Sequence, residues 1–323
     1  MNIIIFGGAG FIGSYIVDYY IKSKEISKII VYDNFSSGKK WHLQSHTDNQ
    51  KLIIADLDIC NIHEYNPELK FDLAIMLAAN PDISKAINHP LIDFNQGTVL
   101  IQKVLEFLRI NNIPRLLYAS GSGVYGDVGS FRCDENYGPM FPISTYGASK
   151  LGCEALISSY AFMFGIKSTS FRFGNVVGGR QTHGVAYDFI LNLKKNSKTL
   201  NILGNGSQSK PYIHIEDIIK AIDCVKNNQN DIYDVYNVAP DDAISVNEIA
   251  DIVINFMKKK NGIVTRHYTG GERGWKGDVP IVRLNSKKLK SLGWRLSYTS
   301  LEAVTKSVQE MLLNINYIEP NVK

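Results

Sequence analysis

The chain has 323 residues, of which 45% are apolar, so it can bury the core of one large domain or two ordinary ones, which excludes a disordered or fibrous protein. The formal charge of +4 is the difference between 35 basic and 31 acidic residues, and the basic residues are scattered apart from a run at 258–260 that is typical of a solvated helix end. This distribution excludes the clustered basic face of a nucleic-acid-binding protein but is compatible with an anionic small ligand.

The four cysteines form neither a Cys-x-x-Cys pair nor the spacing of a Cys/His metal site, so we expect reduced thiols and no bound metal: Cys60, Cys133, Cys153 and Cys224. The N-terminus begins on an apolar segment without a basic leader, and the chain holds no apolar run of about 18 residues. We therefore expect a cytoplasmic protein that is not associated with a membrane.

Strand and helix patterns alternate along the first half of the chain. Residues 2–6 predict a short buried strand, which is followed by a glycine cluster and a helical pattern over 12–24. Helical stretches of ten or more residues separate most of four further predicted strands, at 29–32, 52–55, 73–78 and 116–120. This alternation favours a Rossmann-type doubly wound α/β fold, with a parallel sheet that is covered on both faces.

The second half is less regular and contains amphipathic helices between three loop-like segments, at 178–184, 204–211 and 270–279. The apolar segment 235–238 predicts another strand of the first sheet, so the two domains should be interleaved. We predict a Rossmann domain over 1–174 with a further strand near 232–239. A smaller α/β substrate domain is predicted mainly over 175–323.

Three glycines between the first strand and the first helix, Gly7, Gly10 and Gly13, form a G-x-x-G-x-x-G motif. Glycines in this position allow a tight turn, a close approach of the backbone to a pyrophosphate and close packing of the helix on the strand. Asp33 lies 20 residues after Gly13, at the end of the second predicted strand, where its carboxylate can accept hydrogen bonds from ribose hydroxyls. The same charge repels a 2′-phosphate, so NAD is favoured over NADP, although Lys39 and Lys40 weaken this preference.

This spacing resembles that of the extended short-chain dehydrogenase/reductases, and in particular of the NAD-dependent nucleotide-sugar epimerase/dehydratase family. The segments that carry the resemblance are 6–13, which includes Phe11 and Ile12, the pair Asp33 and Asn34, and the pair Asp56 and Leu57. The resemblance implies that Asp56 and Leu57 lie by the adenine of the cofactor. It also implies that Leu77, Ala78 and Ala79 line the cofactor cleft, a segment that can equally be read as a plain buried strand.

Tyr146 and Lys150 are four residues apart, which on a helix places a phenol and an ammonium on the same face. The hydroxyl of a free tyrosine has a pKa of about 10, too high for a base at neutral pH, and a nearby cation lowers that pKa. The phenolate can then remove a proton from a sugar hydroxyl while a hydride leaves the same carbon for NAD. Because this pair follows a dinucleotide motif and a fifth strand, we interpret it as the catalytic core.

Residues 120–126, Ser-Gly-Ser-Gly-Val-Tyr-Gly, resemble the family segment that supplies a third catalytic group, a Ser or Thr hydroxyl that bonds the reacting sugar oxygen. The position that usually carries this hydroxyl is Gly121 here, with serines on either side, and we choose Ser122 over Ser120. Related dehydratases carry an acidic pair, and decarboxylases tend to carry a Glu, just before the Val-Tyr-Gly, whereas residues 121–123 contain no carboxylate. Dehydration and decarboxylation are therefore disfavoured.

The resemblance continues into the second half and implies residues that bind a nucleotide diphosphate. Asn175 would contact the pyrophosphate and Lys210 would place a positive charge on it, whereas His183 is either a sugar contact or an ordinary loop residue. Arg273 and Asp278 resemble an Arg-x-x-Gly-Asp element with altered spacing, in which the arginine binds phosphate and the aspartate a ribose hydroxyl. A salt bridge between these two side chains is the alternative.

Three hypotheses follow for the function. The first is a nucleotide-sugar 4-epimerase acting on a UDP- or GDP-linked sugar, the second a hexose or heptose 4-dehydrogenase that releases a 4-keto sugar, and the third an inactive NAD-binding scaffold. The displaced serine motivates the second, and the intact Tyr146 and Lys150 argue against the third. Apolar stripes at 92–108 and 146–164 fit a homodimer or a higher homo-oligomer of the family type, or an intramolecular core.

Overall fold

The computed structural model describes residues 1–64, 69–261 and 263–318. The chain divides into two compact units that alternate along the sequence. The first unit comprises Met1–Val124, Thr145–Arg172 and Ile219–Tyr236, and the second comprises Tyr125–Ser144, Phe173–Ile218 and Asn237–Lys323.

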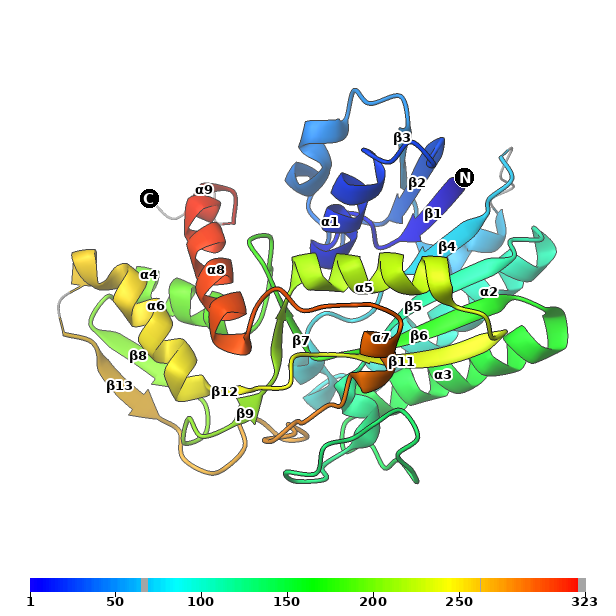
Figure 1. Ribbon diagram of the computed structural model, residues 1–323. Helices are drawn as coiled ribbons and strands as arrows, with labels where there is room; N and C mark the ends of the chain where they lie inside the picture. The colour runs from blue at the N-terminus through cyan, green and yellow to red at the C-terminus, as the bar shows by residue number, and fades with distance from the viewer. Residues whose placement is uncertain (65–68, 262, 319–323) are drawn as a thin grey trace. The chain divides into compact units, whose positions relative to one another are not determined.

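A seven-stranded sheet in the order β11-β6-β5-β4-β1-β2-β3 organises the first unit (Figure 1). Its strands are β1 (Asn2–Phe6), β2 (Lys28–Asp33), β3 (Leu52–Asp56), β4 (Leu73–Met76), β5 (Arg115–Gly121), β6 (Lys167–Phe173) and β11 (Tyr233–Val238). The pairs β3–β2, β2–β1, β1–β4 and β4–β5 are parallel. Each strand predicted from the sequence is present, and the predicted Rossmann-type sheet is confirmed.

Both faces of this sheet are buried at its central strands, whereas Ile53 and Ile54 of the edge strand β3 are exposed. Residues that alternate along β1 and β2, such as Ile4 and Tyr32, join a core cluster with residues of α2 (Leu100–Ile110) and α3 (Thr145–Phe164). Ile3 and Val31, whose side chains point to the opposite face, are also fully buried. The predicted apolar stripe at 92–108 therefore contributes to the core of its own unit.

The connections between the strands differ from the sequence-based prediction. The β1–β2 connection contains α1 (Phe11–Tyr20) and the β4–β5 connection contains α2, whereas β2–β3 and β3–β4 contain the short 3₁₀ helices η1 (Lys40–His46) and η2 (Ile59–Glu64). The expectation that long helices separate most of the strands was wrong here. The mostly polar residues 34–39 form an irregular segment with bends instead of the apolar stripe that a long helix needs. The β4–β5 connection also contains the 3₁₀ helix η3 (Ile83–Ile87) and the π-helical turn η4 (Phe94–Val99).

The order of the strands creates a switch point between β1 and β4. The chain runs outward from β1 through β2 to β3 and then crosses to the other side of β1 to form β4. In open parallel sheets, ligands bind beyond the carboxyl ends of the strands at such a point. The glycine-rich turn after Phe6 and the segment after Met76 both lie there, because Phe6 pairs with Met76 at the ends of β1 and β4.

The second unit is built from short strands and helices. Parallel β7 (Asn175–Val177) and β10 (Tyr212–His214), antiparallel β9 (Ser209–Lys210) and β12 (Ile244–Ser245), and parallel β8 (Thr199–Ile202) and β13 (Thr265–Tyr268) form two-stranded sheets. The helices are α4 (Val185–Lys195), α6 (Val246–Asn261), α7 (Lys287–Ser291), α8 (Ser300–Leu313) and α9 (Ile315–Ile318), and α4, α6 and α8 share one apolar core. The basic run at 258–260 lies near the end of α6, and its side chains are outside the described part.

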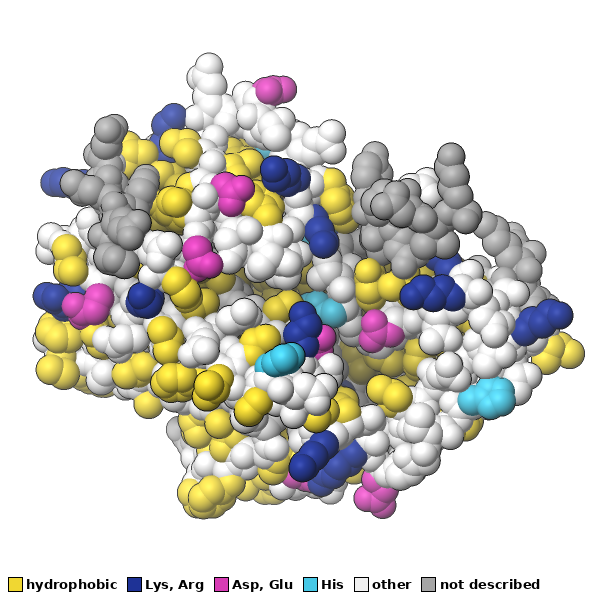
Figure 2. Space-filling model, turned by 180° about the vertical axis from the view of Figure 1, so that it is seen from behind, with side chains coloured by type: hydrophobic (Ala, Val, Ile, Leu, Met, Phe, Trp, Pro, Cys, Tyr) yellow, Lys and Arg dark blue, Asp and Glu magenta, His cyan; other side chains and the backbone are white. Residues whose placement is uncertain are grey.

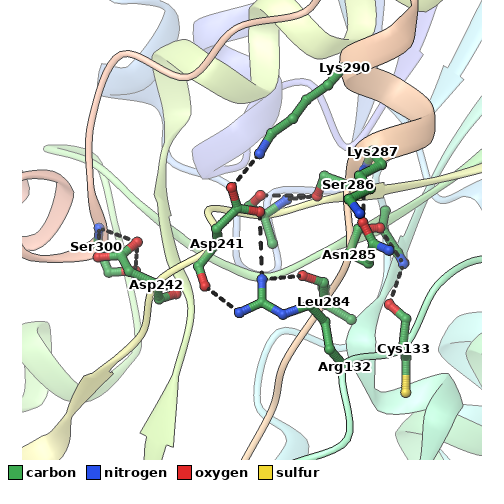
Figure 3. Close-up of polar contacts among 12 residues, drawn as sticks. Arg132, Cys133, Asp241, Asp242, Leu284, Asn285, Ser286, Lys287, Lys290 and Ser300 are labelled. Atoms are coloured by element: carbon green, nitrogen blue, oxygen red, sulfur yellow. Dashed lines mark hydrogen bonds and ion pairs between the residues drawn. The ribbon is translucent and has the colours of Figure 1, made fainter.

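Two segments fall in a different unit from the one that the sequence suggested. Residues 125–144 precede α3 but belong to the second unit, where Cys133 exchanges backbone hydrogen bonds with Arg283 and Asn285. Figure 3 shows Arg132 and Lys290 converging on Asp241, with Arg132 Nη2 2.8 Å from the Asp241 carbonyl oxygen. A loop without periodic apolar residues carries no signal for these long-range contacts.

The second of these segments is most of α5 (Ile215–Asn228), which joins the first unit from Ile219 onward. The Arg115 guanidinium of β5 donates hydrogen bonds to the Lys226 and Val225 carbonyls at the end of this helix. These contacts attach the C-terminal end of α5 to β5, in the first unit.

Membrane-spanning helices, metal sites, disulfides and the distribution of surface charge can be examined over the described part of the chain. Among the described residues, no helix is long and apolar enough to span a membrane, and no group of three His, Cys, Asp or Glu side chains is arranged to hold a metal ion. The four cysteines all lie in the described part of the chain, and none of them forms a disulfide there. On the face shown in Figure 2, Lys and Arg side chains are dispersed among acidic and apolar ones.

Candidate active site

The glycine-rich turn at the end of β1 forms a cradle that side chains would fill. A Cβ at Gly7, whose φ is +80°, would lie 2.8 Å from the Ala78 nitrogen, and one at Gly13 would lie 2.4 Å from the Gly7 carbonyl oxygen. Gly10 precedes α1 and provides no side-chain cap, so no side chain of the N-cap residue bonds the first amides of the helix. Such a cradle at a helix N-terminus fits the pyrophosphate of a dinucleotide.

Asp33 at the end of β2 is tied directly to this cradle. Its two carboxylate oxygens accept hydrogen bonds of 2.9 Å from the amides of Ala9 and Phe35. Burial raises the pKa of Asp33, and the hydrogen bonds from Phe35 and Ala9 oppose that rise. The carboxylate is thus fixed beside the glycine-rich turn.

The other predicted cofactor residues gather at the same edge of the sheet. Asp56 pairs in register with Asp33, and the Leu57 amide donates a hydrogen bond of 3.3 Å to the Asp33 carbonyl oxygen. The amides of Leu77 and Ala78 bond the Phe6 carbonyl oxygen at the end of β1. Asn34 directly follows Asp33, and Ala79 continues the segment after β4, so residues that are distant in sequence lie along the carboxyl edge of the sheet.

Tyr146 and Lys150 lie on the first turns of α3, as the sequence predicted. The Lys150 Nζ atom lies 5.5 Å from the centre of the Tyr146 ring and 4.8 Å from that of Tyr118, and only 5% of Lys150 is exposed. Its ammonium donates a hydrogen bond of 2.7 Å to the Ala119 carbonyl oxygen on β5. The cation is therefore held between two aromatic rings and a strand end, beside the phenol.

The N-terminal turn of α3 is anchored by a buried aspartate that the sequence analysis did not identify. The Asp93 carboxylate accepts hydrogen bonds from the Thr145 hydroxyl at 2.7 Å and from Asn80 Nδ2 at 2.8 Å, while the Ser149 hydroxyl donates to the Asp93 carbonyl oxygen. These contacts flank Tyr146 on both sides. The sequence offers no local signal for them, because Asp93 and Thr145 are 52 residues apart.

The two candidate serines lie at the end of β5 and at the start of the segment that follows it, and they differ in their contacts. Ser120 is 4% exposed, and its hydroxyl donates a hydrogen bond of 2.6 Å to the Glu154 carboxylate. Ser122 begins the 3₁₀ helix η5 (Ser122–Tyr125), is partly exposed and forms no side-chain hydrogen bond with any described residue. Between them, a Cβ at Gly121 would find no atom within 4 Å.

In the second unit, Lys210, Arg273 and Asp278 come together although 68 residues separate the first from the last. Lys210 Nζ lies 2.6 Å from Asp278 Oδ1, and the Arg273 guanidinium donates to the Asp278 carbonyl oxygen and to the Asp127 carboxylate. The alternative salt bridge between Arg273 and Asp278 is not formed, because the Asp278 carboxylate pairs with Lys210 and Asp127 is the ionic partner of Arg273. The result is a pair of cations, each balanced by one carboxylate.

Asn175 and His183 lie elsewhere in the second unit. Asn175 is the first residue of β7 and pairs with Tyr212, whose pKa is raised to about 12 because burial outweighs the hydrogen bond from Asn175. His183 is exposed in the loop before α4, and its Nδ1 atom lies 3.4 Å from the Thr182 hydroxyl.

Known proteins share this architecture over nearly the whole chain. The family model described as "NAD dependent epimerase/dehydratase family" matches residues 3–239. A putative UDP-glucose 4-epimerase of Methanocaldococcus jannaschii is 30% identical over 320 residues, which cover 97% of this chain and 99% of that protein.

Two solved structures show the same likeness. The crystal structure of a UDP-galactose 4-epimerase has a TM-score of 0.84 at 32% identity and covers 98% of this chain and 99% of its own. That of the UDP-glucose 4-epimerase from Thermotoga maritima with UDP-glucose has a TM-score of 0.83 at 26% identity and covers 98% of this chain and 100% of its own. With the glycine cradle, the switch-point aspartate and the paired tyrosine and lysine in place, the chain belongs to the NAD-dependent epimerase/dehydratase family.

Proposed function

We propose that this protein is a nucleotide-sugar 4-epimerase that uses NAD and acts on a UDP-linked sugar. The observation that carries the proposal is the Tyr146–Lys150 pair, held beside β5 in the same unit as the glycine cradle. Relatives and solved structures named as 4-epimerases of UDP-sugars, at 26% to 32% identity, support the proposal, although other relatives are named as 4,6-dehydratases of dTDP- or UDP-glucose, at 29% and 27% identity. These relatives favour UDP over GDP as the nucleotide.

Bound NAD would supply reversible hydride transfer at C4 of the sugar, whereas the residues of the chain move the proton and fix the geometry. Tyr146 takes the proton of the C4 hydroxyl through its phenol oxygen. It gives the proton back after the 4-keto sugar has rotated to present its other face. The positive charge of Lys150 stabilises the phenolate form of Tyr146. Asp33 binds the ribose of the cofactor, and the amides at the start of α1 bind its pyrophosphate.

Ser122 is the third catalytic hydroxyl in this proposal. Its side chain has no partner among the described residues, so it is available to donate to the C4 oxygen, whereas the Ser120 proton is directed to Glu154. A hydroxyl donor at the reacting oxygen stabilises the charge that develops as the proton leaves. The open space at Gly121 leaves room for that oxygen or for a neighbouring substituent of the sugar.

The diphosphate of the substrate is assigned to Lys210 and Arg273, with Asn175 as a further donor. A guanidinium can bond two phosphate oxygens at once, and an ammonium adds a compact positive charge. Asp278 accepts from a ribose hydroxyl of the nucleotide, and His183 contacts the sugar.

A 4-dehydrogenase that releases the keto sugar is the second candidate, because Gly121 replaces the hydroxyl that normally holds the reacting oxygen. Dehydration is disfavoured, since residues 121–123 supply no acid to protonate a leaving hydroxyl. Incubating the protein with UDP-glucose, UDP-galactose and their N-acetyl and uronic acid counterparts, with NMR detection of C4 inversion, tests the proposal. Inversion without net NADH supports an epimerase, accumulation of NADH with a keto sugar supports the dehydrogenase, and inertness toward all of them rejects both.

We also propose that the protein assembles as a homodimer or a higher homo-oligomer through the C-terminal end of α3. Most apolar residues of α2 are buried within the first unit, but Phe162 and Met163 near the end of α3 are 71% and 72% exposed. Adjacent exposed apolar side chains of this size are typical of an interaction surface.

A further inference from the structure

A buried ion pair lies next to the catalytic lysine and has no part in the reaction described above. Glu154 of α3 and Arg172 of β6 form it, with side chains only 5% and 4% exposed. Arg172 Nη2 lies 2.7 Å from Glu154 Oε2, and its Nε atom bonds both carboxylate oxygens at 3.1 and 3.2 Å. Because burying an ion pair in place of apolar residues seldom adds stability, its presence at this position calls for a reason other than stability.

The carboxylate of this pair makes one further bond, and that bond leads toward the catalytic site. Glu154 Oε1 accepts a hydrogen bond of 2.6 Å from the Ser120 hydroxyl, which is a short bond of the charge-assisted kind. Ser120 directly follows Ala119, whose carbonyl oxygen accepts the Lys150 ammonium at 2.7 Å. An unbroken set of contacts therefore runs from Arg172 through Glu154 and Ser120 to the carbonyl that holds Lys150.

Helix geometry makes this arrangement specific to one face of α3. Tyr146, Lys150 and Glu154 follow one another at intervals of four residues, so they lie along the same face of the helix, toward β5. The phenol and the ammonium act at its N-terminal end, and the carboxylate bonds the strand that they face. Gly121, the last residue of β5, has no side chain that could pack against a neighbour. The end of β5 therefore loses a restraint when the Ser120 hydrogen bond is removed.

We propose that Glu154, held by Arg172, is a positioning residue that acts through Ser120 to fix the Ala119 carbonyl and thereby the Lys150 ammonium beside Tyr146. The inference rests on the proposed function for its kinetic consequence. The other groups that face Lys150 are the phenol of Tyr118 on β5 and the thiol of Cys153 on α3. Neither contacts Arg172, Glu154 or Ser120 through a hydrogen bond that would replace the one proposed.

The test uses Ser120→Ala, Ser120→Thr, Glu154→Gln and the double variant Ser120→Ala/Glu154→Gln, with Ser168→Ala as the matched control. Ser168 is a fully buried serine on β6 whose hydroxyl bonds the Ile166 carbonyl oxygen, away from the catalytic pair. For Ser120→Ala we expect a loss of kcat of about tenfold, with KM changed by less than about twofold, whereas Ser120→Thr retains most of the rate. The control keeps the kcat of the unmodified protein.

The double variant distinguishes a positioning role from a direct one. If Ser120 and Glu154 act as one unit, the double variant loses no more kcat than the more impaired single variant, since residues in one network are not additive. Losses that multiply in the double variant would assign Ser120 an independent role and overturn the proposal. If Glu154→Gln does not fold, the contrast between Ser120→Ala and Ser120→Thr decides, and equal kcat values in both overturn it.

A crystal structure of Ser120→Ala provides a readout that does not depend on turnover. We expect Lys150 Nζ to lie beyond hydrogen-bonding distance of the Ala119 carbonyl oxygen in that structure. A Lys150 that keeps this bond unchanged would reject the inference. If the unmodified protein inverts no nucleotide sugar, the proposed function fails, but the position of Lys150 in the variant still decides the positioning role.

Discussion

The Asp33 carboxylate accepts a hydrogen bond of 2.9 Å from the amide of Ala9, which ties the acidic end of β2 to the glycine-rich turn after β1. Because burial raises the pKa of Asp33, this carboxyl takes up a proton at a higher pH than an ordinary aspartate does. In the ligand-free protein a raised pKa means that the folded state binds the proton more tightly. The contribution of Asp33 to stability therefore falls as pH rises from the unfolded pKa through the folded one.

The pH dependence of NAD affinity has the opposite sign to that of stability, because only the ionised carboxylate accepts hydrogen bonds from both ribose hydroxyls. We expect NAD affinity, measured by calorimetry, to fall as the pH is lowered. Because the pKa of Asp33 is raised, this fall should begin at a pH above the ordinary aspartate pKa of about 4. Asp33→Asn should bind NAD more weakly at neutral pH and lose this dependence. If the unmodified protein and Asp33→Asn show the same pH profile, Asp33 does not bind the ribose.

The open position at Gly121 allows the third hydroxyl to be moved. Ser122→Ala should lower kcat by about tenfold, and adding Gly121→Ser to it should restore most of the rate, because a Cβ there meets no atom within 4 Å. Gly126→Ser is the steric control, since its φ of +76° and a distance of 2.1 Å from the new Cβ to the Phe141 carbonyl oxygen predict a clear loss of thermal stability. Full activity in Ser122→Ala would remove this serine from the mechanism.

Arg273 is paired with Asp127 in the ligand-free protein, so a diphosphate must compete with that carboxylate. Asp127→Asn should therefore bind UDP about two- to fivefold more tightly, a gain limited by the modest strength of an ion pair that solvent reaches. The matched change Asp134→Asn, in the same loop, removes a carboxylate that bonds the Asn136 amide and should leave UDP affinity unchanged. Equal affinities in both variants, measured by calorimetry, would argue that Arg273 does not bind the diphosphate.

The exposed end of α3 predicts the state of assembly. Phe162→Lys should convert a dimer or higher oligomer to a smaller species, because a charge replaces a side chain that is 71% exposed and apolar. Ser159→Lys, an exposed position of the same helix, is the control for the added charge. Light scattering that finds the unmodified protein monomeric, or Phe162→Lys of unchanged mass, would contradict the proposed interface.

Local patterns in the sequence predict the elements that carry their own signal. The apolar run 2–6 became β1 over the same residues, and the glycine spacing placed the cradle correctly at the N-terminus of α1. Tyr146 and Lys150 fall on one helix because their spacing of four residues is a helical repeat. Glu154 continues that repeat, so its place on the buried face was open to prediction, but its function was not.

Contacts between distant segments carry no comparable signal. Arg172 meets Glu154 only because β6 lies beside β5 in the sheet, and Asp127 meets Arg273 across 146 residues of sequence. The residues at 34–51 also lacked a local clue to a 3₁₀ turn in place of a longer helix. Tertiary packing decides such features, and it enters the sequence only through pairs of residues that are far apart.

The most direct test of the account is the rate of C4 inversion in Tyr146→Phe, measured by NMR with the UDP-sugar that the unmodified protein converts. The account predicts a loss of at least about a hundredfold in kcat, since the variant lacks only the hydroxyl that carries the proton, with NAD and UDP affinities unchanged. Inversion by Tyr146→Phe at the rate of the unmodified protein would contradict it.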